Sequence, residues 1–218
     1  MHRSGTSFLV GSLQQHGLFL GKHRTSNKFN LRGNRENPDI QDLQDAILRK
    51  SGGSWDMPPP VVEWRPEHFE DAQGILAEYA DHPVWGFKDP RALLTLDGWR
   101  ALVPDLELVG IFRHPLRVAQ SLKRRDDMAH EKALGLWELY NQRLLEVHRQ
   151  QSFPILCFDE EAPVLQAKLL ELVEMLGLER VSVDEPFFAD ELRQAGAEGG
   201  SVPAGLQELY GQLCAVSI

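Results

Sequence analysis

Cysteine is scarce in this sequence, and an excess of positive charge and long apolar runs are absent. The chain of 218 residues has two cysteines, Cys157 and Cys214, whose spacing fits neither a metal site nor a disulfide framework, so we expect two reduced thiols. Its 32 acidic residues outnumber 23 lysines and arginines, and the net charge of −9 argues against a general binder of nucleic acid or anionic membranes. No apolar run is long enough to span a bilayer, and we find no signal peptide, which predicts a cytoplasmic protein.

What is present is typical of a globular domain. With 42% hydrophobic and 25% charged residues, the chain is long enough to bury a sizeable core. We find no internal repeat or low-complexity segment, and predict a single domain over residues 1–218. The stretch AEGGSVPAG predicts a loop before a short terminal helix, so residues 190–218 are expected to form a peripheral tail.

Several segments carry the signals of helix ends or of one apolar helix face. The stretch SFLVGSLQQHG predicts a short helix that ends at Gly17. Asn37 and Pro38 predict the N-cap and the first residue of a second helix, with Gly52 beyond its end. A longer helix over residues 131–150 is predicted from apolar residues at a 4-3-4-3 spacing, which are Ala133, Trp137, Tyr140, Leu144 and Val147.

Three short apolar segments predict buried strands, and each precedes a helical segment: Val84–Lys88, Leu106–Phe112 and Pro154–Phe158. Strands that alternate with helices form a parallel sheet with helices on both faces. We therefore predict an α/β fold of three layers, with a central parallel sheet between two layers of helices. In such folds ligands bind at the carboxyl ends of the strands, so charged residues at those positions are candidate site residues.

The opening residues HRSGTS have the form of an anion-binding loop. In the nucleotide-binding pattern G-x-x-x-x-G-K-[ST], Gly5 matches the second glycine and Ser7 the hydroxyl residue, but Thr6 stands in the place of the lysine. That difference argues against an ATPase or GTPase. An anion could still be bound by backbone N–H groups around Gly5, by a helix N-terminus, and by the side chains of Arg3, Ser4, Thr6 and Ser7. Serine-rich helix starts are also common as simple caps, so the loop alone leaves both interpretations open.

Two further charged clusters follow predicted strands. KDPR (Lys88–Arg91) ends the first of these strands, and RHP (Arg113–Pro115) ends the second, with Ser121 eight residues after Arg113 on the next helix. An arginine at a strand end and a serine about two helical turns further on can converge on one phosphate. Singly, each would be an ordinary surface residue. Together with the loop, they predict a ligand with two separated anionic groups.

Three motifs of the chain resemble signatures of the sulfotransferase family, which uses 3′-phosphoadenosine-5′-phosphosulfate (PAPS) as donor: HRSGTS, KDPR and FRHPLRVAQSL. Further segments resemble parts of bacterial sulfotransferases in the same order: GNREN, LTLDGW, GLWELYNQRLL and PILCFDE. The resemblance extends to about Gly177. It implies a P-loop-like fold and sulfuryl transfer to a hydroxyl or amine of an acceptor. It also implies that the opening loop binds the 5′-phosphosulfate, and that Arg113 and Ser121 bind the 3′-phosphate.

The same resemblance implies catalytic roles. Sulfuryl transfer is an in-line displacement in which negative charge grows on the departing nucleotide, so a cation must lie there. Lys88 resembles the lysine in the KDP motif of tyrosylprotein sulfotransferases and is the first candidate for this cation, with Arg3 the second. The acceptor also needs a base, for which Glu36 resembles the glutamate of a G-x-x-E-N segment in bacterial relatives, and Asp89 is the alternative. We expect no metal, because such a leaving group needs none and the sequence shows no metal-ligand spacing.

Structural roles are open alternatives for these charged residues. Glu36 precedes a predicted helix and could instead favour the helix dipole. Asp89 could hold Lys88 or Arg91 in place, and Arg91 could form a structural ion pair rather than support the donor.

The chain departs from the family pattern at its first residues. In relatives an apolar strand precedes the loop, whereas HRSGTS here follows Met1 directly. We expect that the true start lies upstream of Met1; the alternatives are that another segment fills the gap or that donor binding is impaired. Two other functions remain open, a P-loop nucleotide kinase or transferase and a non-catalytic nucleotide-binding domain. The acceptor, a sugar, a lipid or small-molecule alcohol or a peptide tyrosine, is expected to contact residues 22–36 and 51–66.

Overall fold

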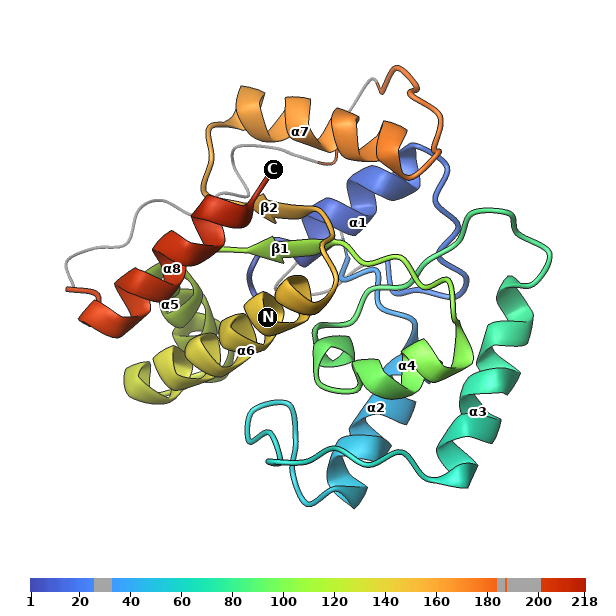
Figure 1. The fold of residues 1–218 in the computed structure, drawn as a ribbon, viewed down its shortest axis with the longest axis horizontal. Coiled ribbons are helices and arrows are strands. Elements are labelled where there is room, and N and C mark those ends of the chain that lie inside the picture. Colours follow the sequence, from blue (N-terminus) through green and yellow to red (C-terminus); the bar gives the residue numbers. More distant parts are fainter. Residues whose placement is uncertain (26–32, 184–186, 188–200) are drawn as a thin grey trace.

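A computed structural model provides the structure of the chain and describes residues 1–25, 33–183, 187 and 201–218. Helices predominate, and two short strands lie between them (Figure 1). In chain order the helices, 3₁₀ turns (η) and strands are α1 (Thr6–Gln15), α2 (Pro38–Lys50), α3 (Pro66–Leu76), η1 (Ala77–Tyr79), η2 (Pro90–Leu93), α4 (Leu96–Leu102), β1 (Gly110–Phe112), α5 (Pro115–Asp126), α6 (His130–Gln150), β2 (Ile155–Cys157), α7 (Ala162–Met175) and α8 (Ala204–Val216).

The two strands form a parallel sheet that lies between two groups of helices. β1 pairs with β2 so that Ile111 is opposite Leu156 and Phe112 is opposite Cys157. Because side chains alternate along a strand, Ile111 and Leu156 pack against α1 and α7, whereas Phe112, Ile155 and Cys157 pack against α5, α6 and α8. Figure 1 shows these helices on opposite faces of the sheet. The chain is thus a mixed α/β protein with helices on both faces of a small parallel sheet.

The strands are shorter than the sequence predicted, and one of the three is absent. Leu106–Phe112 is reduced to β1, and Pro154–Phe158 is reduced to β2. Val84–Lys88 forms no strand, since its contact with a neighbouring segment is a single parallel bridge between Trp85 and Phe19. The prediction of a strand there was wrong because an extended segment becomes a strand only when a partner pairs with it over several residues.

The predicted helix ends are confirmed at α2. Asn37 caps this helix, because its side-chain Oδ1 accepts hydrogen bonds from the N–H groups of Asp39 at 2.9 Å and Ile40 at 3.4 Å. Pro38 is the first helical residue, where its missing N–H costs nothing. Gly52, one residue beyond the C-cap, has a φ of 85°. α2 therefore begins and ends as the sequence predicted.

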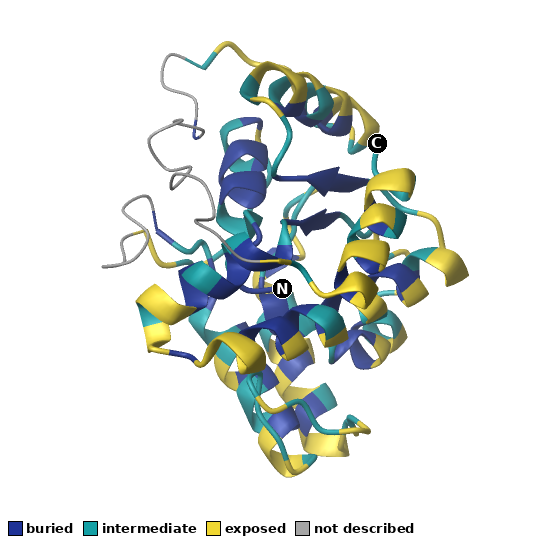
Figure 2. Cartoon of the chain, turned by 90° about the vertical axis from the view of Figure 1, so that its left-hand side faces the viewer, coloured by how far each residue is buried: buried dark blue, intermediate teal, exposed yellow. Residues whose placement is uncertain are grey.

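The predicted apolar face of α6 is also confirmed. All five of its predicted residues are buried, with Ala133, Trp137 and Tyr140 at 0% exposure. The residues expected as a peripheral tail include α8, whose Leu206, Leu209 and Leu213 are buried in the same core cluster. Figure 2 shows the buried strands at the centre and the exposed residues on the outer sides of the helices. Among the described residues, none of the helices combines the length and the apolar character needed to cross a bilayer.

Candidate functional site

The opening loop rests on the carboxyl end of the sheet. Gly5 has a φ of 90°, and a Cβ atom at this position would lie 2.5 Å from ring atoms of Phe158, the residue that follows β2. Glycine alone avoids both the left-handed strain and this clash. The turn from the loop into α1 is therefore fixed directly against the end of β2.

This loop has polar groups whose hydrogen-bonding capacity is not used. Within the described ranges no side chain caps the start of α1, although the N–H groups of a first helical turn carry partial positive charge and need acceptors. The hydroxyl of Ser4 is buried and has no hydrogen-bond partner in the described part of the chain. Arg3 has a φ of 65°, a left-handed conformation that is uncommon outside glycine and concentrates at ligand sites. These features are typical of a loop that binds an anion.

Arg3 connects the loop to α5. Its Nε donates a hydrogen bond to Oγ of Ser121 over 2.8 Å, between residues 118 positions apart in the sequence. Ser121 lies on the second turn of α5 and is buried. The structure therefore places the predicted phosphosulfate loop and the predicted 3′-phosphate serine in direct contact.

Arg113 belongs to the same cluster. It follows β1 directly and is 6% exposed, and its Cζ lies 5.2 Å from the centroid of the Phe158 ring. Asp159 fixes the turn after β1, because Oδ1 lies 3.8 Å from Nε of Arg113 and Oδ2 accepts a 2.5 Å hydrogen bond from the N–H of His114. Since the Phe158 ring lies against both Gly5 and Arg113, the two predicted anion-binding elements are neighbours.

The surroundings of Arg3 are cationic. Burial and the nearby charges of Arg125 and Arg113 lower the pKa of Arg3 to about 10, whereas Asp126 opposes that shift. Asp126 is itself paired with Arg125 at 2.7 Å. Positive charge is thus concentrated at one place in an acidic protein. A bound anion would relieve the repulsion among these guanidinium groups.

Lys88 and Glu36 form a buried ion pair near the start of α1. Nζ of Lys88 lies 2.8 Å from Oε1 of Glu36, and the two side chains are 11% and 9% exposed. Asn34 links this pair to α1, because its Nδ2 donates to Oε2 of Glu36 at 3.4 Å and its carbonyl accepts from Oγ of Ser7 at 3.3 Å. The residues predicted as leaving-group cation and as base are thus in contact beside the start of α1.

Two effects act on the pKa of Lys88. Burial lowers it, whereas the charge of Glu36 and the hydrogen bond to that carboxylate oppose the shift. The carboxylate of Glu36 therefore favours the charged amine of Lys88 against the effect of burial.

Asp89 and Arg91 have structural contacts. Oδ1 of Asp89 accepts from the N–H of Arg91 at 2.7 Å and caps η2, and Nη1 of Arg91 lies 3.1 Å from both carboxylate oxygens. Nε of Arg91 donates to Asp45 at 2.5 Å. Burial raises the pKa of Asp89, against the effect of Arg91. Of the alternatives that the sequence left open, these contacts favour Asp89 as the residue that holds Arg91 in place.

The sequence prediction missed three contributors to this region. Asn34 and Asp159 lie within GNREN and PILCFDE, so the motifs carried a signal for them. Trp55 lies within residues 51–66, which were expected to contact the acceptor, but no motif singled it out: its ring centroid lies 4.3 Å from that of His2 and 5.3 Å from Cζ of Arg125. Part of the loop expected to contact the acceptor, residues 26–32, lies outside the described residues.

Comparisons with protein-family models, with curated proteins and with solved structures find no match for this chain. In the described ranges, no group of three or more histidine, cysteine, aspartate or glutamate side chains is placed to hold a metal ion.

Proposed function

We propose that the chain is a sulfotransferase with a P-loop-like fold, which transfers the sulfuryl group of PAPS to a hydroxyl or amine of an acceptor. The contact between Arg3 and Ser121 carries this proposal. It places the loop before α1 beside the helix after β1, so one nucleotide with two anionic groups could reach both. Two anion sites on distant faces of the molecule could not both contact one nucleotide.

The residues of the two elements fit the two anionic ends of the donor. Arg113 and Ser121 would bind the 3′-phosphate, because a guanidinium and a hydroxyl both donate hydrogen bonds to phosphate oxygens. The loop from Ser4 to Ser7 would bind the phosphosulfate through the N–H groups at the start of α1 and the hydroxyl of Ser4, for which the described part of the chain provides neither a side-chain cap nor a hydrogen-bond partner. Arg3 lies between these elements and could donate to either end.

The Lys88–Glu36 pair fits the chemistry of transfer. The acceptor oxygen or nitrogen forms a bond to sulfur while the bond from sulfur to the bridging oxygen of the nucleotide breaks, and the electron pair remains on that oxygen. Lys88 would stabilise the developing charge there, with Arg3 as the second candidate. Glu36 would accept the proton that the acceptor loses.

Transfer of label from ³⁵S-labelled PAPS to a panel of sugar, alcohol, amine and phenol acceptors tests the proposal. Lys88→Ala is expected to lower the rate by about 10²–10³-fold, the range for loss of one group that stabilises transition-state charge. Lys132→Ala is the matched control, because it removes a half-exposed lysine that pairs with Asp56 on the surface. Its rate is expected to equal that of the parent protein.

Two outcomes would contradict the proposal. Equal transfer rates for Lys88→Ala and the parent would remove Lys88 from the chemistry. Tight binding of adenosine 3′,5′-bisphosphate without transfer to any acceptor would instead favour a non-catalytic nucleotide-binding domain.

A further inference from the structure

The two cysteines of the chain meet where α8 packs against β2. Cys157 is the last residue of β2 and is 5% exposed, whereas Cys214 lies on α8 and is exposed. A side-chain hydrogen bond links the thiol of Cys214 to that of Cys157. Their spacing in the sequence predicted no such contact, because only tertiary packing brings the two segments together.

Tyr210 adds a third polar group to this contact. Its hydroxyl lies 3.7 Å from Sγ of Cys157 and donates to Oδ2 of Asp159 at 3.4 Å. Tyr210 and Cys214 are four residues apart on α8, so their side chains lie on the same face of the helix. One face of α8 therefore presents a hydroxyl and an exposed thiol to the buried thiol at the end of β2.

α8 is fixed against β2 on both sides of Cys214. Leu213 is 0% exposed and belongs to the same core cluster as Cys157. Beyond the helix, the N–H of Ile218 donates to the carbonyl of Ile155 in β2 at 3.0 Å. Figure 1 shows the C-terminal end of α8 beside β2. The two thiols therefore stay close while the protein is folded.

We propose that Cys157 and Cys214 are a site of reversible oxidation, where hydrogen peroxide joins the two thiols in a disulfide bond. Cys214 is the residue that meets the oxidant, because its side chain is exposed. Cys157 is the resolving thiol, because it is buried and already in contact with Cys214. This inference does not depend on the proposed sulfuryl transfer.

The oxidation takes place in two steps. In the first, the thiolate of Cys214 attacks one oxygen of the peroxide, the O–O bond breaks, and the departing hydroxide takes up the thiol proton to form water. In the second, the thiolate of Cys157 attacks the sulfenic sulfur, the S–O bond breaks, and the departing hydroxide takes up a proton to form a second water. A dithiol reductant reverses the change by thiol–disulfide exchange.

Oxidation at this site is expected to be slow at neutral pH. Burial raises the pKa of both thiols and the charge of Asp159 adds to this shift, whereas the hydroxyl of Tyr210 opposes it. The charge of Glu160 also raises the pKa of Cys214. Since only the thiolate reacts, the rate is expected to rise about tenfold for each pH unit between about pH 7 and pH 8.5.

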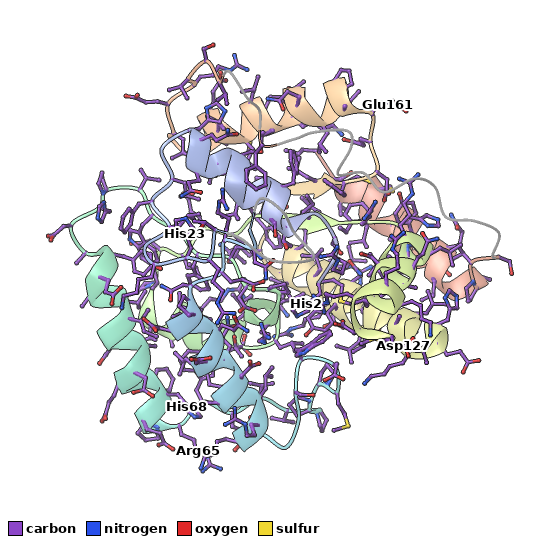
Figure 3. All side chains as sticks on the ribbon, turned by 180° about the vertical axis from the view of Figure 1, so that it is seen from behind. His2, His23, Arg65, His68, Asp127 and Glu161 are labelled. Carbon is purple, nitrogen blue, oxygen red and sulfur yellow. The ribbon has the colours of Figure 1, made fainter. Side chains whose placement is uncertain are left out.

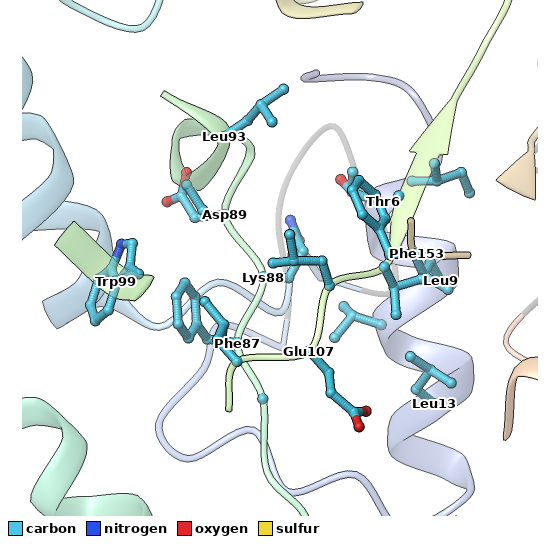
Figure 4. Close-up of a pocket in the computed structure, with 18 of the residues that line it drawn as sticks. Thr6, Leu9, Leu13, Phe87, Lys88, Asp89, Leu93, Trp99, Glu107 and Phe153 are labelled. Atoms are coloured by element: carbon cyan, nitrogen blue, oxygen red, sulfur yellow. The ribbon is translucent and has the colours of Figure 1, made fainter. Parts of the chain in front are cut away.

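The cysteine pair lies apart from the lysine proposed for sulfuryl transfer. Lys88 borders a cavity of about 610 Å³ that also reaches Gly110 and Ile111 of β1. Figure 4 shows Lys88 at this cavity, together with Phe87 and Glu107. Among the described residues that line the cavity there is no cysteine. Oxidation of the pair therefore modifies no side chain of this lining.

Peptide mapping of the protein without prior reduction tests the proposal. After treatment with hydrogen peroxide at about pH 8, we expect a pair of peptides joined through Cys157 and Cys214 in a protein that stays monomeric, and separation of the pair by dithiothreitol. The melting temperature of the oxidised protein is expected to be about 5–10 °C higher than that of the reduced protein, because the bond restricts the unfolded chain.

Two single variants separate the roles of the cysteines. Cys157→Ser is expected to stop the reaction at the sulfenic acid of Cys214, which dimedone labels. Cys214→Ser changes an exposed residue and is expected to leave the fold intact. In this second variant Cys157 is expected to remain a thiol under the same treatment, because burial keeps the oxidant away from it.

Three results would overturn the proposal. One is a disulfide between two copies of the chain through Cys214, with Cys157 still a thiol. Another is oxidation of Cys214 to the sulfinic acid in the parent protein, because a thiol in contact with it would resolve the sulfenic acid first. The third is a lower melting temperature of the oxidised protein, which would show that the bond forms only after α8 leaves β2.

Discussion

The Nε atom of Arg3 lies 2.8 Å from Oγ of Ser121, and this contact joins the loop before α1 to the helix after β1. Each residue belongs to a motif that has an ordinary structural explanation when it stands alone. The contact joins residues 118 positions apart, so neither motif alone predicts it. It makes a single ligand with two anionic groups a physically reasonable occupant of this part of the protein.

The ion pair between Lys88 and Glu36 predicts a strong coupling in unfolding experiments. Lys88→Met and Glu36→Leu are each expected to lower the free energy of unfolding by about 3 kcal/mol, because each leaves a buried charge without its partner. The double variant is expected to recover to within about 1 kcal/mol of the parent, since an apolar pair replaces the ionic one. Urea denaturation of the four proteins measures the coupling free energy.

The exposed pair of Lys22 and Glu78, whose atoms lie 2.7 Å apart, is the control for this cycle. Its side chains are 58% and 38% exposed, and Lys22 also pairs with Asp39 at 3.1 Å, so the coupling between Lys22 and Glu78 is expected to be much weaker than that between Lys88 and Glu36. If the loss in unfolding free energy of the double variant equalled the sum of the losses in Lys88→Met and Glu36→Leu, the two charges would not stabilise each other, and the prediction would be wrong.

Gly5→Ala is expected to destabilise the protein by about 2–4 kcal/mol. The substitution combines a left-handed backbone with a Cβ atom 2.5 Å from the Phe158 ring. Gly135→Ala in α6 is the matched control, because nothing lies within 4 Å of its Cβ position and alanine favours the helix by about 0.5–1 kcal/mol. Thermal melting compares the two, and equal melting temperatures would contradict the tight packing of the loop on β2.

The buried imidazole of His2 is expected to make the free energy of unfolding fall at acidic pH. It lies toward the middle of the molecule in Figure 3, and burial, followed by the charges of Arg91 and Arg125, holds its pKa well below 6.5. Below pH 6.5 the unfolded chain therefore binds a proton at His2 that the folded chain does not, so stability is lost as the pH falls from 6.5 toward the lowered pKa.

The variant His2→Phe keeps a ring beside Trp55 but cannot titrate. Its melting temperature is expected to fall less than that of the parent between about pH 6.5 and pH 5, and the two pH profiles should be parallel above about pH 7.5. Profiles that remain parallel through the acidic range would contradict a buried neutral imidazole.

Local signals allowed much of this fold to be predicted. The cap at Asn37 and the spacing of apolar residues along α6 depend on neighbours within one or two helical turns, so the sequence shows them directly. The candidate site residues Arg3, Arg113 and Ser121 could be proposed for a similar reason, because each lies at a fixed offset within a short motif.

Contacts between distant segments could not be predicted in this way. Lys88 and Glu36 are 52 positions apart, and no local pattern indicates that they pair. The segment Val84–Lys88 has the apolar composition of a buried strand, but it forms no strand in the structure. Strand formation depends on pairing with a neighbouring segment, which the composition does not reveal. Trp55 lies in an irregular region where periodicity gives no information, and its place beside His2 and Arg125 follows only from tertiary packing.

One nucleotide is expected to contact both the loop before α1 and the pair of Arg113 and Ser121. Calorimetric titration with adenosine 3′,5′-bisphosphate and with ADP tests it most directly, in the parent, in Arg113→Ala and in the control Lys123→Ala on the exposed side of α5. We expect the bisphosphate to bind more tightly than ADP, and Arg113→Ala to weaken the bisphosphate by about 10–100-fold with little effect on ADP or in the control. Equal affinities for the two nucleotides, or an Arg113→Ala variant that binds the bisphosphate as the parent does, would contradict the account.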